Sequence, residues 1–152
     1  MSATYKEAID QIYSVIRTNW NSGTTAIMGY VPPIYWPGVE SPAIPDGSKY
    51  WAHVSNQTVI EGQTCVSAID GVLNKRRYTT HGILFIQLFC PKSDTQSMQK
   101  GRALATLSRN GYRGMSTAGG VWFRNAKISE LDAENVFNRL NVSVEYEYDE
   151  IY

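Results

Sequence analysis

Cysteine and long apolar runs are what this 152-residue chain has least of. Only Cys65 and Cys90 occur, which excludes a disulfide framework and a Cys-x-x-Cys metal pair. No apolar run approaches the roughly 20 residues that span a bilayer, and residues 1–6 lack the apolar core of a secretion signal. We therefore expect a protein that is made in a reducing cytoplasm and has no membrane partner.

A surplus of either charge is also missing, because 14 Lys and Arg residues are balanced by 14 Asp and Glu residues. Phosphate neutralisation needs surplus positive charge, so the composition argues against a general nucleic-acid binder. Hydrophobic residues make up 43% of the chain and charged residues 18%, a balance typical of a folded domain. The length predicts a single domain that spans residues 1–152.

Catalytic and metal-binding sets with a credible spacing are absent as well. His53 and His81 are the only histidines, and both fall in segments that read as strands. A nucleophile pair of Cys90 and His81 would need both side chains to converge, which the sequence does not show. The acidic residues near the C-terminus follow at two-residue steps, about 6 to 7 Å apart on one strand face, which is too open for a Ca²⁺ site. We therefore expect no enzyme activity, no cofactor and no metal site.

A capping box marks the start of the first helix, since Thr4 and Glu7 have the Thr-x-x-Glu spacing. Apolar residues then recur at helical spacing as far as Trp20, and the Asn and Gly residues over 19–23 predict the end of this helix. Residues 21–49 contain five of the six prolines and predict a long irregular loop with a short strand at residues 34–36.

Alternating and apolar stretches predict a sheet, with strands at residues 50–55, 62–67, 76–90, 121–128 and 140–149. Residues 83–90 of the third are nearly continuous in apolar residues, which predicts a central strand covered on both faces. The last alternates most cleanly, with apolar residues on one side and acidic residues on the other. Ser93 and Gln96 offer a second capping box for a helix over residues 93–110. The predicted fold class is α+β, a mostly antiparallel sheet with an N-terminal helix and a second helix packed on it.

The charges are unevenly distributed along the chain. Over residues 71–114 Asp94 is the one acid among the bases Lys75, Arg76, Arg77, Lys92, Lys100, Arg102, Arg109 and Arg113. Over residues 129–152 Arg139 is the one base among the acids Glu130, Asp132, Glu134, Glu145, Glu147, Asp149 and Glu150. One interpretation is two solvated faces of one domain. The other is self-complementarity, in which the basic surface of one copy meets the acidic surface of the next and the contacts close into a ring.

Four local sequences occur in a recognisable order. They are the amphipathic helix over residues 4–20, the aromatic strand over 50–54, the glycine-led strand over 82–91 that ends in Phe89-Cys90-Pro91 before a helix, and the acidic alternating strand over 142–150. Together they resemble the tail terminator proteins of long-tailed bacteriophages of the lambda type, also called tail completion or minor tail proteins. The resemblance covers most of the chain, and its motifs are structural.

The resemblance implies a structural protein of the virion at the junction of tail and neck, made in the cytoplasm of the host bacterium. Such proteins form a hexameric ring on the head-proximal end of the tail tube. The ring stops polymerisation of the tube and joins it to the head connector, and DNA later passes through the lumen without sequence-specific binding. The implied partners are further copies of the chain, the tail tube protein and the head–tail connector.

One set of candidate residues concerns the contact between copies. We expect the basic helix face formed by Lys100, Arg102 and Arg109 to meet the acidic strand residues Glu145 and Glu147 of a neighbouring copy. Opposite charges on two different surfaces of one chain are what a head-to-tail contact requires.

A second set concerns contacts with the tube, the connector or the lumen. We expect the turn formed by Lys75, Arg76 and Arg77, together with Tyr35 and Trp36 of the Pro-rich loop, to make these contacts. An ordinary charged turn at the start of a strand is the simpler interpretation of the three basic residues.

Two other functions remain open at this stage. A head-closure protein or another neck protein shares the size and the ring habit of a tail terminator. A small cytoplasmic enzyme or ligand-binding domain is the alternative from a different class, and the missing set of convergent catalytic residues argues against it.

Overall fold

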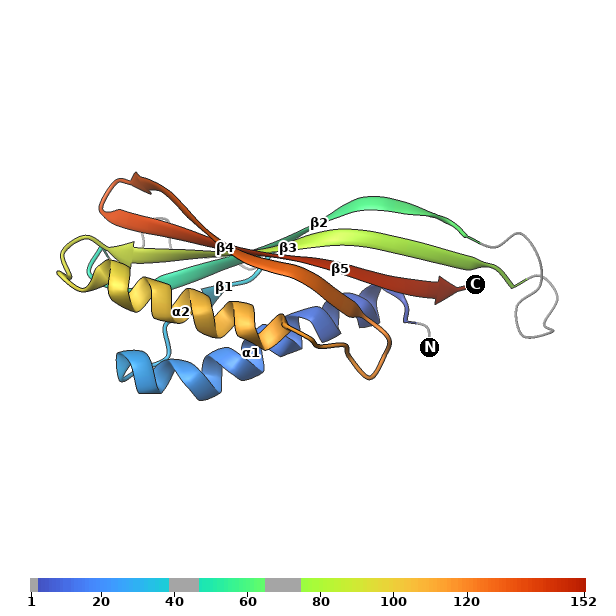
Figure 1. The fold of residues 1–152 in the computed structure, drawn as a ribbon, viewed down its shortest axis with the longest axis horizontal. Helices are drawn as coiled ribbons and strands as arrows, with labels where there is room; N and C mark the ends of the chain where they lie inside the picture. The colour runs from blue at the N-terminus through green and yellow to red at the C-terminus, as the bar shows by residue number, and fades with distance from the viewer. Residues whose placement is uncertain (1–2, 39–46, 65–74) are drawn as a thin grey trace.

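The computed structural model describes residues 3–38, 47–64 and 75–152. Two helices pack on one face of a five-stranded sheet, so the predicted α+β class is confirmed (Figure 1). The elements are α1 (Tyr5–Met28), β1 (Ile34–Tyr35), β2 (Trp51–Gln63), β3 (Arg77–Pro91), α2 (Ser97–Tyr112), β4 (Trp122–Glu134) and β5 (Phe137–Ile151). The strand order is β1-β2-β3-β5-β4, with β1 parallel to β2 and every other pair antiparallel. Neither helix is long and apolar enough to cross a membrane.

The capping box at the start of α1 is confirmed. The Thr4 hydroxyl accepts the backbone N–H of Glu7 at 3.3 Å, and the Glu7 carboxylate accepts the backbone N–H of Thr4 at 2.9 Å. Two N–H groups that no helical carbonyl can reach are thereby satisfied.

The predicted end of α1 is wrong, since the helix continues to Met28. A Cβ on Gly23 would lie 2.6 Å from the Leu107 side chain, so this glycine permits close packing of α1 on α2 and does not end the helix. The true C-cap is Gly29, which has a φ of 78° and whose N–H bonds to the carbonyl of Thr25 at 2.8 Å. The irregular segment therefore begins at Gly29, and its residues 39–46 lie outside the described residues.

The second capping box is also wrong, because α2 begins at Ser97 and its N-cap Gln96 makes no side-chain capping bond. The carboxylate of Asp94 accepts the backbone N–H of Gln96 at 2.9 Å, while the Asp94 carbonyl accepts the N–H of Ser97 at 3.1 Å. The helix then runs through Gly111 to Tyr112, whose hydroxyl donates to the Ile12 carbonyl at 2.7 Å. Contacts with α1 therefore hold the last turn of α2.

Two strands are longer than predicted. β2 is one strand of 13 residues, although residues 57–63 are exposed and have no buried side to give an alternating pattern. Backbone pairing with β3 keeps residues 57–63 extended. Of the strand predicted separately at residues 62–67, residues 65–67 lie outside the described residues. β4 extends to Glu134 through two irregularities in its pairing with β5, one of them at Asn125 with a φ of 54°. Such bulges interrupt the period of two that sequence patterns rely on.

The inner face of the sheet packs against the two helices. Its buried residues alternate along the central strands: Leu84, Ile86 and Leu88 of β3, and Leu140, Val142, Val144, Tyr146 and Tyr148 of β5. The alternation predicted for the last strand is thus confirmed. Trp20 of α1 lies in the same core, with its indole N–H donating to the Pro32 carbonyl at 2.7 Å.

The other face, which we call the open face, is not covered by any described element. It consists of the odd-numbered residues of β2 up to Gln57, of β3 and of β5, together with Ile60 of β2 and with Trp122, Arg124, Lys127, Ser129 and Leu131 of β4. Ile83 and Phe85 of β3 lie on it and are only half-buried. The prediction of a central strand covered on both faces is therefore wrong for the described chain, although β3 does lie in the middle of the sheet.

Gly82 gives a test of the packing under the β2–β3 hairpin. A Cβ at Gly82 would overlap the ring of Tyr146 and lie 2.8 Å from the backbone oxygen of Gln57, so Gly82→Ala is expected to lower the free energy of unfolding by about 1–3 kcal/mol. Gly62→Ala is the matched control, because Gly62 lies in the same hairpin with nothing within 4 Å. Denaturant titration of both variants measures the difference, and equal midpoints would contradict the packing described.

Candidate interaction surfaces

The open face brings apolar and charged residues together on a surface that none of the described elements covers. A shallow hollow of about 650 Å³ crosses it and is lined by Ile83 and Phe85 of β3, by Leu131 of β4 and by polar residues of β4 and β5. Trp122, the first residue of β4, is 65% exposed on the same face. Exposed apolar groups within a charged surface are typical of interaction sites.

The acidic residues predicted for the contact between copies lie on this face. Glu147 lies 3.6 Å from His81 and 3.6 Å from Arg124, and Glu145 accepts a hydrogen bond from Asn125. Both carboxylates therefore have partners within their own chain. Each of the three ion-pair members is more than one-third exposed, so these pairs add little stability.

The basic residues of the same prediction lie on α2, on the opposite side of the sheet. Lys100 pairs with Asp94 at 3.1 Å, and Arg102 pairs with Glu130 of β4 at 2.7 Å. The hydrogen bond between Arg102 and Glu130 raises the pKa of the guanidinium and lowers the pKa of the carboxyl. Arg109 has no carboxylate partner among the described residues. Of the three predicted bases, only Arg109 is not paired with a carboxylate within the described chain, and it donates to the Asn110 side chain at 3.2 Å.

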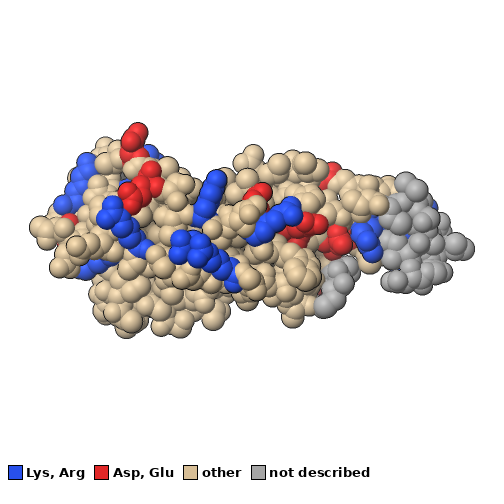
Figure 2. Space-filling model, viewed as in Figure 1, with Lys and Arg blue, Asp and Glu red and all other residues tan. Residues whose placement is uncertain are grey.

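Figure 2 shows the consequence of this pairing for the visible surface. Lys and Arg side chains are interspersed with Asp and Glu side chains and do not gather into a single-sign patch. The charge blocks of the sequence therefore meet within one copy. The structure brings the basic segment 71–114 and the acidic segment 129–152 together through Arg102–Glu130 and Arg77–Asp149. Arg124, which belongs to neither segment, pairs with Glu147.

The aromatic residues predicted for contacts with tube or connector pack on their own domain. Tyr35 lies against Trp51, with ring centroids 5.2 Å apart. Trp36 lies between Tyr13, at 5.2 Å, and the guanidinium of Arg17, at 5.1 Å. Both predicted residues remain half-buried.

The basic turn lies far from these aromatic residues. Tyr35 pairs with His53 near the start of β2, whereas Arg77 begins β3 beside the end of β2 at Gln63. Ten residues of strand separate the two places, a distance of about 33 Å. The second predicted set therefore divides between the two ends of the sheet and does not form one patch.

The sequence did not predict an aromatic cluster that lies on the open face. Trp51 and Phe89 stack with centroids 3.9 Å apart, and Phe137 meets both edge-on at 5.8 and 6.0 Å. The three residues come from β2, β3 and β5. Only the strand register, which places Trp51 opposite Phe89, makes them neighbours, and no local pattern in the sequence reveals this register.

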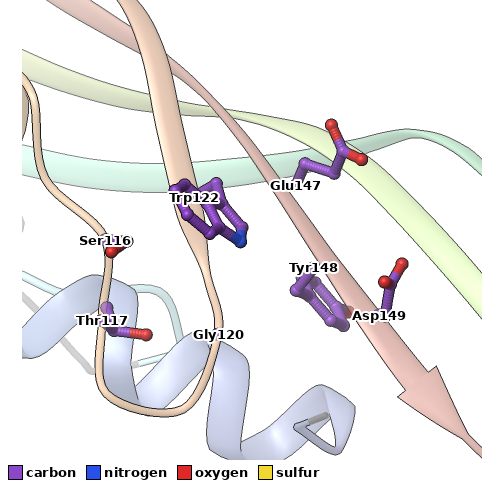
Figure 3. Close-up of a pocket in the computed structure, with 7 residues that line it drawn as sticks. All are labelled: Ser116, Thr117, Gly120, Trp122, Glu147, Tyr148 and Asp149. Atoms are coloured by element: carbon purple, nitrogen blue, oxygen red, sulfur yellow. The ribbon is translucent and has the colours of Figure 1, made fainter. Parts of the chain in front are cut away.

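A second hollow, of about 290 Å³, lies where β4 begins beside β5 (Figure 3). Trp122 stands between the 116–120 loop and β5, while Glu147 and Asp149 project from the same side of β5. The ring of Tyr148 and the polar residues Ser116 and Thr117 complete the lining. The lining therefore combines aromatic rings, hydroxyl groups and two carboxylates.

The wall of this hollow is held in place by α1. The Thr117 hydroxyl donates to the side chain of Gln11 in α1 and accepts the N–H of Val121 at 3.1 Å. The N–H of Thr117 bonds to the Val121 carbonyl at 2.9 Å, and Gly120 turns the chain with a φ of 94°. The hollow is thus a defined part of the fold.

Cys90 and His81 do not converge. They are nine residues apart on β3, with Cys90 buried on the inner face and His81 on the open face. Burial raises the pKa of the Cys90 thiol to about 12. Within the described ranges, no three His, Cys, Asp or Glu side chains gather as a metal site would require. Cys65 lies outside those ranges.

Comparison with known proteins establishes the fold and no more. No protein-family model matches the chain, and no curated protein matches it. Among the solved structures that match, one of a protein whose name describes no function is similar with a TM-score of 0.53 and 17% sequence identity. The similarity covers 91% of this chain and 94% of the other. At this level of identity the likeness concerns the arrangement of helices and strands.

Asp94 gives a test of the pairing that engages Lys100. Its carboxylate accepts hydrogen bonds from the Gln96 N–H, the Tyr50 hydroxyl and Lys100, which lower its pKa from 3.8 to about 2. A lowered pKa stabilises the fold above pH 4, and this stability is lost as the pH falls from about 4 to about 2. Asp94→Asn is expected to lower the Tm at pH 7, by an amount that shrinks over that window.

The matched control for this variant is Asp132→Asn. Asp132 is exposed, and its side chain makes no ion pair or hydrogen bond with the described residues. Thermal unfolding followed by circular dichroism at several pH values compares the two variants with the parent chain. A pH-independent loss in Asp94→Asn would show that the carboxylate is not held as described.

Proposed function

We propose that this chain is a structural assembly protein of the phage neck, a tail terminator. Copies form a ring, a hexamer by resemblance, on the head-proximal end of the tail tube. The ring ends polymerisation of the tube and joins it to the head connector, and DNA passes through its lumen without sequence-specific contacts. The protein then resides in the virion and catalyses no reaction.

The observation that carries this proposal is the open face of the sheet. Exposed apolar area is unfavourable in water, so a chain that acts alone is more stable when apolar residues such as Ile83 and Phe85, which are only half-buried here, are covered. A protein that works as part of an assembly leaves such surface for its partners. The order of elements, from the N-terminal helix to the acidic last strand, supports the same proposal.

The separation of the two candidate contact regions also supports it. The basic turn and the aromatic residues Tyr35 and Trp36 lie at opposite ends of the sheet, about 33 Å apart. A protein between a tube and a connector needs a different contact at each end. In the proposal, one region serves each partner.

Tail tubes test this proposal directly. Mixed with polymerising tail tube protein, the chain is expected to give tubes that stop growing and carry a ring at one end in negative-stain micrographs. Native mass spectrometry of the isolated or released assembly should give about six times the 17.1 kDa chain mass. Tubes that keep growing with bare ends, in the presence of folded protein, would refute the function.

Arg109 tests the predicted contact between copies. Arg109→Glu is expected to reduce the yield of rings at least 10-fold, because it sets a carboxylate against Glu145 and Glu147 of the neighbour. The control is the exchange of Arg102→Glu with Glu130→Arg, which keeps their ion pair within one copy and should leave rings intact. Native mass spectrometry measures both, and normal rings from Arg109→Glu would exclude Arg109 from the contact.

A further inference from the structure

Trp122 is unusual among the aromatic residues because its side chain is 65% exposed although it lies within a regular strand. It stands opposite Glu147 on the open face, and its neighbour Phe123 points inward against Tyr112. The strand is therefore held in register from the inside, while the indole stays on the surface. Tryptophan is enriched among the residues that dominate the binding energy of protein interfaces.

The groups beside Trp122 specify the chemistry of a ligand. Glu147 and Asp149 line the hollow, and no lysine or arginine does so, although Arg124 lines the adjoining depression beside Trp122. Within its own chain Glu147 lies 3.6 Å from Arg124 and 3.6 Å from His81. Asp149 accepts a hydrogen bond from the Thr79 hydroxyl at 2.6 Å and lies 3.8 Å from Arg77. The three ion-pair distances exceed the 2.7–2.9 Å of a charge-assisted hydrogen bond. A carboxylate has about four acceptor positions on its two oxygens, so both Glu147 and Asp149 keep capacity to accept one further hydrogen bond.

A cationic side chain satisfies both features of the hollow at once. An arginine or lysine can lie over the indole face and at the same time donate hydrogen bonds to the carboxylates. The chain itself carries such groups on its surface. Arg113, Lys92 and Arg109 have no carboxylate partner among the described residues.

The surface that continues from the hollow has the size of a stable interface. Shallow depressions lead from Trp122 past Arg124 to Ile60 and Ile83 on the same side of the sheet. Strands β2, β3, β5 and β4 are each at least 13 residues long, so the open face measures about 43 by 19 Å, or about 800 Å². A specific interface buries about 800 Å² on each partner.

We infer that Trp122, with the carboxylates of Glu147 and Asp149, binds a lysine or arginine side chain of a second copy of this chain. This inference rests on the proposed ring and names the residue on which the contact between its copies depends. Both sides of this contact come from copies of one chain, because the acidic and aromatic hollow and the surface cations without a carboxylate partner belong to the same sequence. Glu147 keeps the role predicted for it, and Trp122 is added as the residue that the contact depends on.

Assembly of Trp122 variants tests the inference. Trp122→Ala is expected to raise the concentration for half-maximal assembly at least about 30-fold, as loss of an interface hot spot does. Trp122→Phe keeps an aromatic face and should shift that concentration less than about 5-fold. Val136→Ala, which removes a half-exposed apolar side chain at the β4–β5 turn, is the control and should not change it. Native mass spectrometry gives the concentrations, and thermal unfolding verifies that each variant is folded.

Fluorescence provides a second readout that does not depend on counting copies. Burial of Trp122 against a neighbour should shift the tryptophan emission of the parent chain to the blue on assembly, and this shift should be lost in Trp122→Phe.

If the parent chain forms rings and Trp122→Ala forms them equally well, the inference is wrong and the proposed function stands. If Trp122→Ala forms normal rings that no longer cap tubes, the hollow binds the tube protein and the inference is again wrong. If the parent chain neither assembles nor caps tubes, the proposed function itself fails.

Discussion

Packing of α1 and α2 against a single face of the sheet determines the rest of this molecule. The two helices meet at Gly23, and they join the sheet through buried residues such as Trp20, Leu104 and Leu140. This layer of helices buries the apolar side chains on the inner face of β3 and β5. The opposite side has no second layer among the described residues, so its side chains either pair with one another or remain available to a partner.

Most of the charged side chains on the open face pair with charged side chains of a neighbouring strand. His81, Glu147 and Trp122 lie side by side on β3, β5 and β4, and Arg124 approaches Glu147 diagonally. The charge blocks of the sequence therefore contribute less to contacts between copies than their number implies. Lys100 and Arg102 are engaged within the chain in the same way. What remains for a neighbour is a smaller set: an exposed indole beside Glu147 and Asp149, whose carboxylates have partners in the chain and keep spare acceptor capacity.

Local signals predicted local features well. The capping box at Thr4 and Glu7 and the alternation of β5 are confirmed, because each depends on residues within a few positions of one another. The end of α1 was predicted wrongly, because Gly23 permits a contact with Leu107 of α2, which lies 84 positions further along the chain. The continuity of β2 was missed for a similar reason: its exposed half owes its extended form to hydrogen bonds with β3 and not to its own pattern. Trp122 was included in a predicted strand, but its exposure follows from the strand register.

The sequence by itself determined the fold class, the order of the elements and the direction in which β5 faces, since helical and strand periods are written in the spacing of apolar residues. It also determined the inventory of charges. Only the tertiary structure decided which charges meet, which glycines bend the chain and which permit close packing, and which side of β3 stays open. Those outcomes depend on the pairing of segments far apart in the sequence, and a shift of one residue in that pairing would exchange the two faces of every strand.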